Sequence, residues 1–198
     1  MGSRILVPAL IAGACVLQAQ ALPAWWKAFT AAPRLESGFR QVSESAVFGR
    51  LEKRGKLRIG KGGRIRVEYQ KGLLLVCDGR TFVQYDAQAR TASKLDLESA
   101  AREAPLLQVL LDPGSLASVF TARPGQGPDT LVLEPRRKGL PKVDLQGKGG
   151  LPSSLAWTDP TGARQVLEFV EPRVPAAAFD AATFTFRAPQ GTRWIDAP

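Results

Sequence analysis

The residues from Gly55 to Asp86 alternate between apolar and polar side chains, and this pattern constrains the fold more than any other feature of the chain. The run 64–69, for example, reads RIRVEY. A period of two is typical of a strand with one buried and one solvent-facing side. The dipeptides Gly62-Gly63 and Asp78-Gly79 favour tight hairpins, because such turns need a positive φ. The stretch therefore predicts a curved antiparallel meander whose apolar face must be covered.

Other segments extend this sheet. Leu73 to Val76 is apolar at consecutive positions, so that strand should be covered on both sides. Gly and Pro separate the later strand patterns, and no linker or repeat indicates a second domain. We expect roughly ten strands in all. Outside the meander, the strand patterns cover residues 35–44, 46–59, 90–95, 130–134, 143–146, 154–158, 164–171 and 183–186.

Helical material is scarce and falls in two places. Pro23 to Ala31 predicts a short helix with Trp25, Trp26 and Phe29 on one side, where the two Trp residues are either core or a docking wedge. Residues 97–104 are rich in helix formers, and Asp112-Pro113 is a plausible start for another short helix through Phe120. Between them, four leucines have helical spacing: Leu106, Leu107, Leu110 and Leu111.

A large sheet exposes an apolar face that a second sheet or closure into a barrel must cover. The predicted helices are too small to fill such a concavity, but they could roof it. A sheet roofed by a leucine-rich lid leaves an interior for an apolar guest. For each single wall residue, ordinary core packing is the alternative to ligand contact. The residues expected on the concave wall are Ile65, Val67, Phe82, Leu133, Trp157 and Phe169.

Residues 1–21 resemble an export signal, with Arg4 before an apolar run and Ala19-Gln20-Ala21 as the cleavage site. The apolar run is shorter than the ~20 residues of a membrane-spanning helix. We therefore expect a single soluble domain, residues 22–198, outside the cytoplasm. An alternative is acylation at Cys15, because residues 12–15 loosely resemble a lipoprotein cleavage box.

The composition argues against several classes of function. The chain has no His, which removes the usual catalytic triads and most zinc sites. Cys77 lies in an apolar strand without a His partner, so we interpret it as a core thiol. The formal charge is +9, but the cations between Arg50 and Lys71 alternate with apolar residues, as on any solvated sheet face. A role in steering toward a membrane or a partner is the alternative. We predict a binding protein rather than an enzyme, without metal, cofactor or nucleic acid.

Three motifs resemble one family. Ile65 to Tyr69 is similar to an aromatic-Arg-Trp-Glu-Tyr strand, Val76 to Asp86 to a Val-Ser-Asp-Gly-Lys-Thr hairpin, and Phe179 to Phe186, followed by 189–191, to a closing strand. The chain thus resembles the periplasmic outer-membrane lipoprotein carriers, the LolA-like proteins. The resemblance implies a mainly β fold, an unclosed antiparallel barrel with a lid of short α-helices.

The resemblance also implies a function. Carriers of this kind bind the acyl chains of lipoproteins, receive them from an inner-membrane lipoprotein-releasing transporter, and pass them to an outer-membrane receptor. A periplasmic monomer is expected. The alternative is a lipid-binding receptor or sensor on the same fold, anchored through Cys15. The family often has an Arg that is thought to latch the lid, and Lys61 stands at its place here. The latch is then looser, or it has moved to Arg58 or Arg64.

Overall fold

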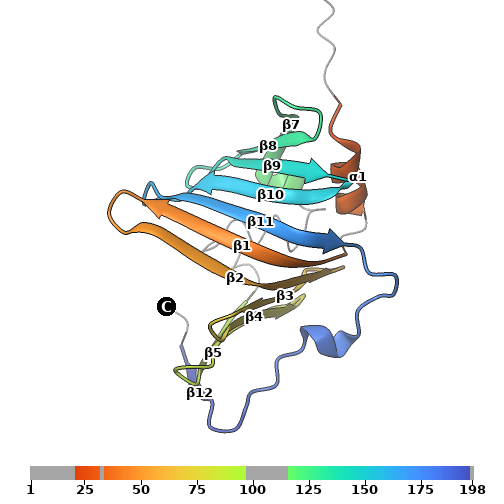
Figure 1. Cartoon of the computed structure of the whole chain (residues 1–198). Helices are drawn as coiled ribbons and strands as arrows, with labels where there is room; N and C mark the ends of the chain where they lie inside the picture. Colours follow the sequence, from red (N-terminus) through yellow and green to blue (C-terminus); the bar gives the residue numbers. More distant parts are fainter. Residues whose placement is uncertain (1–20, 32–33, 97–115, 197–198) are drawn as a thin grey trace, which may run out of the picture.

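One open sheet of twelve strands makes up most of the structure, a computed structural model that describes residues 21–31, 34–96 and 116–196. The strand order is β12-β6-β5-β4-β3-β2-β1-β11-β10-β9-β8-β7, so β12 and β7 are the two edges and the sheet stays unclosed (Figure 1). All neighbouring pairs are antiparallel except β12 and β6. The strands are β1 (Leu35–Ser45), β2 (Gly49–Gly60), β3 (Arg64–Tyr69), β4 (Leu73–Asp78), β5 (Thr81–Asp86), β6 (Thr91–Asp96), β7 (Phe120–Pro124), β8 (Thr130–Pro135), β9 (Val143–Lys148), β10 (Leu151–Thr158), β11 (Arg164–Arg173) and β12 (Arg193–Ile195).

The alternation in the sequence sets which side chains face inward. In β3, Ile65 and Val67 are buried, and the intervening residues are only half-buried. β1 joins the two halves of the sheet, because it pairs with β2 on one side and with β11 on the other. The prediction of a mainly β, unclosed antiparallel fold is confirmed.

The first helix, α1 (Ala24–Ala31), packs at the end of β9 and β10 (Figure 1). Its buried side is formed by Trp25, Trp26 and Phe29, which confirms the predicted helix and the core interpretation of the two Trp residues. The Trp25 indole Nε1 donates a hydrogen bond to the Asp129 carbonyl at 3.1 Å. A Cβ at Gly147 would lie 2.4 Å from that nitrogen, so only glycine lets α1 approach this closely.

The C-terminal segment after β11 runs along the outer face of β3 to β6, the side opposite α1 and the main core (Figure 1). It contains the short 3₁₀ helix η1 (Ala181–Phe184), which Asp180 caps by accepting a hydrogen bond from the Ala182 amide. The buried Phe184 ring packs beside Gly60, where a Cβ would lie 2.8 Å from the ring. The predicted strand at 183–186 is therefore wrong.

The double coverage predicted for Leu73 to Val76 is confirmed only toward the end of β4, because Leu73, Leu74 and Leu75 are half-buried. Cys77 belongs to the main buried cluster, whereas the buried Val76 faces the C-terminal segment beside Phe184.

Three predicted boundaries also need correction. The helix expected to run through Phe120 ends one residue earlier, at Val119 of α4 (Leu116–Val119), and Phe120 already pairs with Pro135 as the first residue of β7. The sequence also predicts a Pro- and Gly-rich loop from Arg123 to Asp129, but β7 continues through Pro124. The strand expected from Ala46 starts at Gly49, because residues 46–48 form the turn of the β1–β2 hairpin. In the described part of the chain, no helix is long and apolar enough to cross a bilayer.

Candidate functional site

A single buried cluster lines the inner face of the sheet and extends onto α1 and α4. It gathers side chains from nearly every strand because the alternation in each strand points every second residue to this side. At its centre Ile59, Ile65, Leu131 and Leu133 have no exposed surface. The cluster is mainly apolar, but the Cys77 thiol belongs to it, and Tyr69, which packs against it, donates its hydroxyl to Gln41 Oε1 at 3.4 Å.

The six residues predicted for the concave wall come together on this face. Ile65, Val67, Phe82, Leu133 and Phe169 are members of the cluster, and the partly buried Trp157 packs against it. These residues lie on five different strands: β3, β5, β8, β10 and β11. Their contact with a ligand stays a prediction.

Sequence reasoning missed further members of the same wall. The residues not singled out include Leu35, Phe39, Leu57, Leu131, Val143 and Leu155. The period-two pattern of β1 and β9 would have found Leu35, Phe39 and Val143. Leu116 and Val119 of α4 lie in the segment that was predicted as a helix through Phe120, but they were not assigned to the wall.

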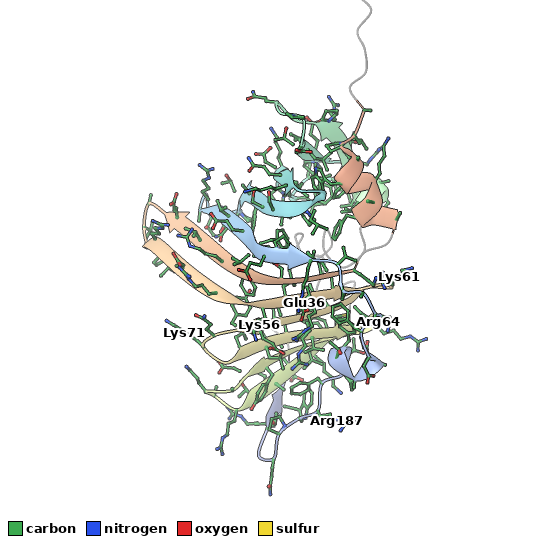
Figure 2. The ribbon with its side chains drawn as sticks, turned by 45° about the vertical axis from the view of Figure 1, so that its right-hand side comes forward. Glu36, Lys56, Lys61, Arg64, Lys71 and Arg187 are labelled. Atoms are coloured by element: carbon green, nitrogen blue, oxygen red, sulfur yellow. The ribbon has the colours of Figure 1, made fainter. Side chains whose placement is uncertain are left out.

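The outer face of the same strands carries charge instead. Glu36 accepts hydrogen bonds from Arg58 Nε at 3.0 Å and from Arg173 Nη2 at 2.6 Å, and these guanidinium groups, Arg173 first, lower the pKa of Glu36. Glu68 is paired with Arg66 and, at 3.6 Å, with Arg58. Figure 2 shows this face with Glu36 and Lys56 labelled; Lys61 and Arg64 lie at one end of the β2–β3 region and Lys71 at the other.

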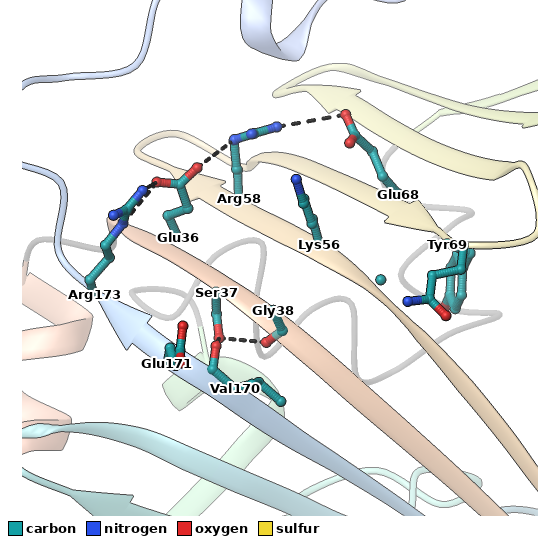
Figure 3. A pocket seen from close by; sticks show the side chains of 12 residues that line it. Glu36, Ser37, Gly38, Lys56, Arg58, Glu68, Tyr69, Val170, Glu171 and Arg173 are labelled. Atoms are coloured by element: carbon teal, nitrogen blue, oxygen red, sulfur yellow. Dashed lines mark hydrogen bonds and ion pairs between the residues drawn. The ribbon is translucent and has the colours of Figure 1, made fainter.

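A groove of about 640 Å³ lies among these charges, between β11, β1, β2 and β3 (Figure 3). A β-bulge forms its wall at β1 and β11, where Glu171 adopts a φ of 51° and the Ser37 hydroxyl donates to the Val170 carbonyl at 3.0 Å. Charged side chains line much of the groove, which lies on the outer face, although Tyr69 in its lining also packs against the buried cluster. The groove is therefore a different surface from the predicted concave wall.

The titratable side chains near the turns have structural roles. Cys77 is fully buried, and burial raises the pKa of its thiol, as expected for a core residue. Asp78 accepts hydrogen bonds from the backbone amides of Arg80 and Thr81, both at 2.9 Å, which lowers its pKa. Asp86 caps the next turn in the same way. In the described ranges, no cluster of three or more His, Cys, Asp and Glu residues could hold a metal ion.

Comparison with known proteins identifies the family. The model of the outer membrane lipoprotein carrier protein LolA matches residues 32–187. The chain belongs to the LolA family. It is also 26% identical, over 168 residues, to an outer-membrane lipoprotein carrier protein from Alcanivorax borkumensis, covering 80% of this chain and 79% of that protein. The resemblance predicted from the three motifs is thus confirmed at the level of the family.

Solved structures of similar shape are more distant. A LolA superfamily protein from Nitrosomonas europaea matches with a TM-score of 0.48 and 9% identity, over 84% of this chain and 99% of that one. An uncharacterized conserved protein from Thermus thermophilus matches with the same TM-score and 14% identity, over 81% of this chain and 91% of that one.

The predicted lid and latch of the family have different outcomes. The leucines assigned to the lid, Leu106, Leu107, Leu110 and Leu111, lie outside the described residues, as does Cys15. Lys61 is exposed in the β2–β3 turn, where its carbonyl accepts a hydrogen bond from Arg64 Nε at 3.0 Å. Arg58 points to the outer face and pairs with Glu36, on the side away from the buried cluster. A latch role for Lys61, Arg58 or Arg64 stays a prediction.

Proposed function

We propose that this protein is a periplasmic carrier that binds the acyl chains of lipoproteins between the inner face of the sheet and a lid that contains Leu106, Leu107, Leu110 and Leu111. It receives its cargo from an inner-membrane lipoprotein-releasing transporter and delivers it to an outer-membrane receptor. The observation that carries the proposal is the family match over residues 32–187. The expected export signal in residues 1–21 and the mainly apolar inner face agree with it.

The inner face suits such a ligand for a physical reason. Each methylene removed from water contributes ~0.8 kcal/mol, so one long acyl chain contributes on the order of 10 kcal/mol. A carrier that captured this energy in full for several chains would not release its cargo. We therefore propose an adaptable contact surface in which Ile65, Val67, Phe82, Leu133, Trp157 and Phe169 cover the chains and the lid moves during loading and release.

The proposal is tested by native mass spectrometry of the protein purified from the envelope of its own cells. We expect a bound fraction whose added mass is that of an acylated lipoprotein or of lipid acyl chains. A protein that stays unliganded, and that also fails to bind a triacylated peptide added in solution, would contradict the carrier function.

A variant separates lid contact from folding. Leu107→Glu places a charge in the proposed lid, and it should weaken binding of the triacylated peptide while the circular dichroism spectrum stays unchanged. Val174→Glu is the matched control, because Val174 lies after β11 with half of its surface exposed. If both variants bound the peptide with equal affinity, Leu107 would not contribute to the proposed binding site.

A further inference from the structure

The apex of the β1–β2 hairpin exposes three large apolar side chains that the proposed function does not use. Val47 is 81% exposed, Phe48 78% and Leu51 55%. Single exposed apolar residues are common on protein surfaces, but three within five positions at one apex form a patch. None of these three residues belongs to the buried cluster, and none lines the outer groove.

The turn that presents these side chains is well formed. Ser45 pairs with Gly49 across the turn of residues 46–48, and Gly49 adopts a φ of 69°, which glycine reaches without steric strain. The Ser45 hydroxyl oxygen accepts hydrogen bonds from the amides of Val47 and Phe48 at 3.2 and 3.4 Å. These two backbone donors are thus already satisfied without water. This matters because an unpaired amide opposes entry into an apolar medium.

The apex also projects beyond its neighbours on one side. β3 pairs with β2 only through Gly55–Gly60, so residues 49–54 of β2 extend past the end of β3. Six residues in a strand span about 20 Å at ~3.3 Å each. Figure 1 shows the β1–β2 turn at the far left of the sheet, at the opposite end of β1 from α1. A flat surface could therefore reach the apex before it reached the sheet.

Two cationic side chains follow the apolar apex along β2. Arg50 and Lys53 follow Phe48 on opposite faces of β2, because successive side chains in a strand alternate. Glu52 is held between Arg40 and Arg54 at 2.9 and 2.7 Å, so its charge is compensated within the hairpin. Arg50 lies 3.9 Å from Glu44, and both side chains are more than half exposed, which makes this a weak pair.

We propose that this apex binds the surface of a membrane that contains anionic phospholipids. Val47 and Phe48 enter the boundary between headgroups and acyl chains, and Arg50 and Lys53 contact lipid phosphates. A bilayer accepts a convex apolar apex without a matching pocket, whereas a protein partner would have to supply one. The proposal goes beyond the carrier function, and it needs no ligand on the inner face.

The experiment is flotation of the purified protein with vesicles. One set contains phosphatidylethanolamine and phosphatidylglycerol, and the other contains phosphatidylcholine alone. We expect the wild type to float with the anionic vesicles and less with the neutral ones. The double variant Val47→Ser, Phe48→Ser should reduce the partition coefficient by about ten-fold, because it removes both apolar side chains from the interface. The double variant Arg50→Gln, Lys53→Gln should lower the partition coefficient by less than this. Added salt should lower the partition coefficient of the wild type in the same way, because it screens the charges.

Val174→Ser is the control, because it removes an exposed apolar side chain elsewhere on the surface. This variant should float like the wild type, and thermal unfolding checks that all variants are folded. The proposal would be overturned if the wild-type protein floated with neither kind of vesicle. Unchanged flotation of the apex variant would overturn it as well, since binding would then occur elsewhere. Equal binding to both vesicles would overturn the assigned role of the cations. These outcomes are independent of acyl-chain binding, so failure here leaves the carrier proposal untouched.

Discussion

Strands β4 and β5 bury side chains on both faces, but the two faces are covered in different ways. Cys77 and Phe82 face the main cluster, to which almost every strand contributes. Val76 and Val83 on the other face are covered by one C-terminal segment, with Phe184 beside them. The inner cover is therefore shared by the whole domain, whereas the outer cover is a local addition. Loss of a side chain should consequently have global effects on the inner face and local effects on the outer one.

The largest effect is expected for Phe82→Ala on the inner face. Phe82 is almost fully buried in the shared cluster, and truncation of such a ring usually lowers the free energy of unfolding by about 3–5 kcal/mol. Urea denaturation followed by tryptophan fluorescence measures the change. Gln84→Ala, at an exposed position of the same strand, should stay within about 0.5 kcal/mol of the wild type. Equal losses in the two variants would contradict the shared inner core.

Phe184→Ala should have a smaller effect, about 2 kcal/mol, although the Phe184 ring is as buried as that of Phe82. The C-terminal segment can lift off locally, which limits the loss to the free energy that holds this segment down. Hydrogen exchange would show the difference, with faster exchange confined to η1 and to β12, which pairs with β6. Faster exchange throughout the sheet would mean that the two faces form one cooperative unit. Thr185→Ala, an exposed neighbour, is the control.

Local patterns in the sequence predicted most of the inner face of the sheet. They did not predict that the C-terminal segment with Phe184 covers the outer face. The alternation in 64–69 reports directly on β3, because one side of that strand is apolar. The run Phe184-Thr185-Phe186 has the same alternation, yet Thr183 donates its amide to the Asp180 carbonyl and closes a 3₁₀ turn. The burial of Phe184 depends on strands that lie more than a hundred residues earlier in the chain. No local pattern could supply that information.

The candidate site shows the same limit. The six predicted wall residues share one face because side chains in a strand alternate between the two faces of the sheet. The alternation is clear in β3, but it is weak in β11, where Phe169 is followed by the apolar Val170. β12 and β7 were missed for different reasons. β12 has only three residues and exists through its pairing with β6, and Phe120 of β7 directly follows a helical turn. The exposed apex at Val47 and Phe48 was also missed, since apolar residues in sequence do not reveal their exposure.

The outer face should respond to pH where the inner face does not. Hydrogen bonds from Arg40 and then Arg54 lower the pKa of Glu52 to about 2 from its ordinary value of 4.5. A carboxyl with a lowered folded-state pKa stabilises the fold above its unfolded pKa, and this contribution is lost as the pH falls from about 4.5 toward 2. We expect the melting temperature to fall less between pH 7 and pH 3 in Glu52→Gln than in the wild type. Gln84→Ala should keep the wild-type slope, and an unchanged slope in Glu52→Gln would contradict the assigned pairing.

The smallest effect on stability is expected for Lys61→Arg at the exposed β2–β3 turn, within about 0.5 kcal/mol. This variant tests the proposed carrier cycle, in which we propose that Lys61 takes the place of the Arg that is thought to latch the lid in the family. A guanidinium forms two directed hydrogen bonds where an ammonium makes a point contact, so Arg should hold a lid more firmly. We therefore expect slower dissociation of a triacylated peptide from Lys61→Arg, measured by competition in stopped flow. Arg64→Lys, at the neighbouring position, controls for a general change of charge geometry at this turn. If both variants release the peptide at the wild-type rate, this turn has no part in closing the inner face, and the lid must be held from another side of the sheet.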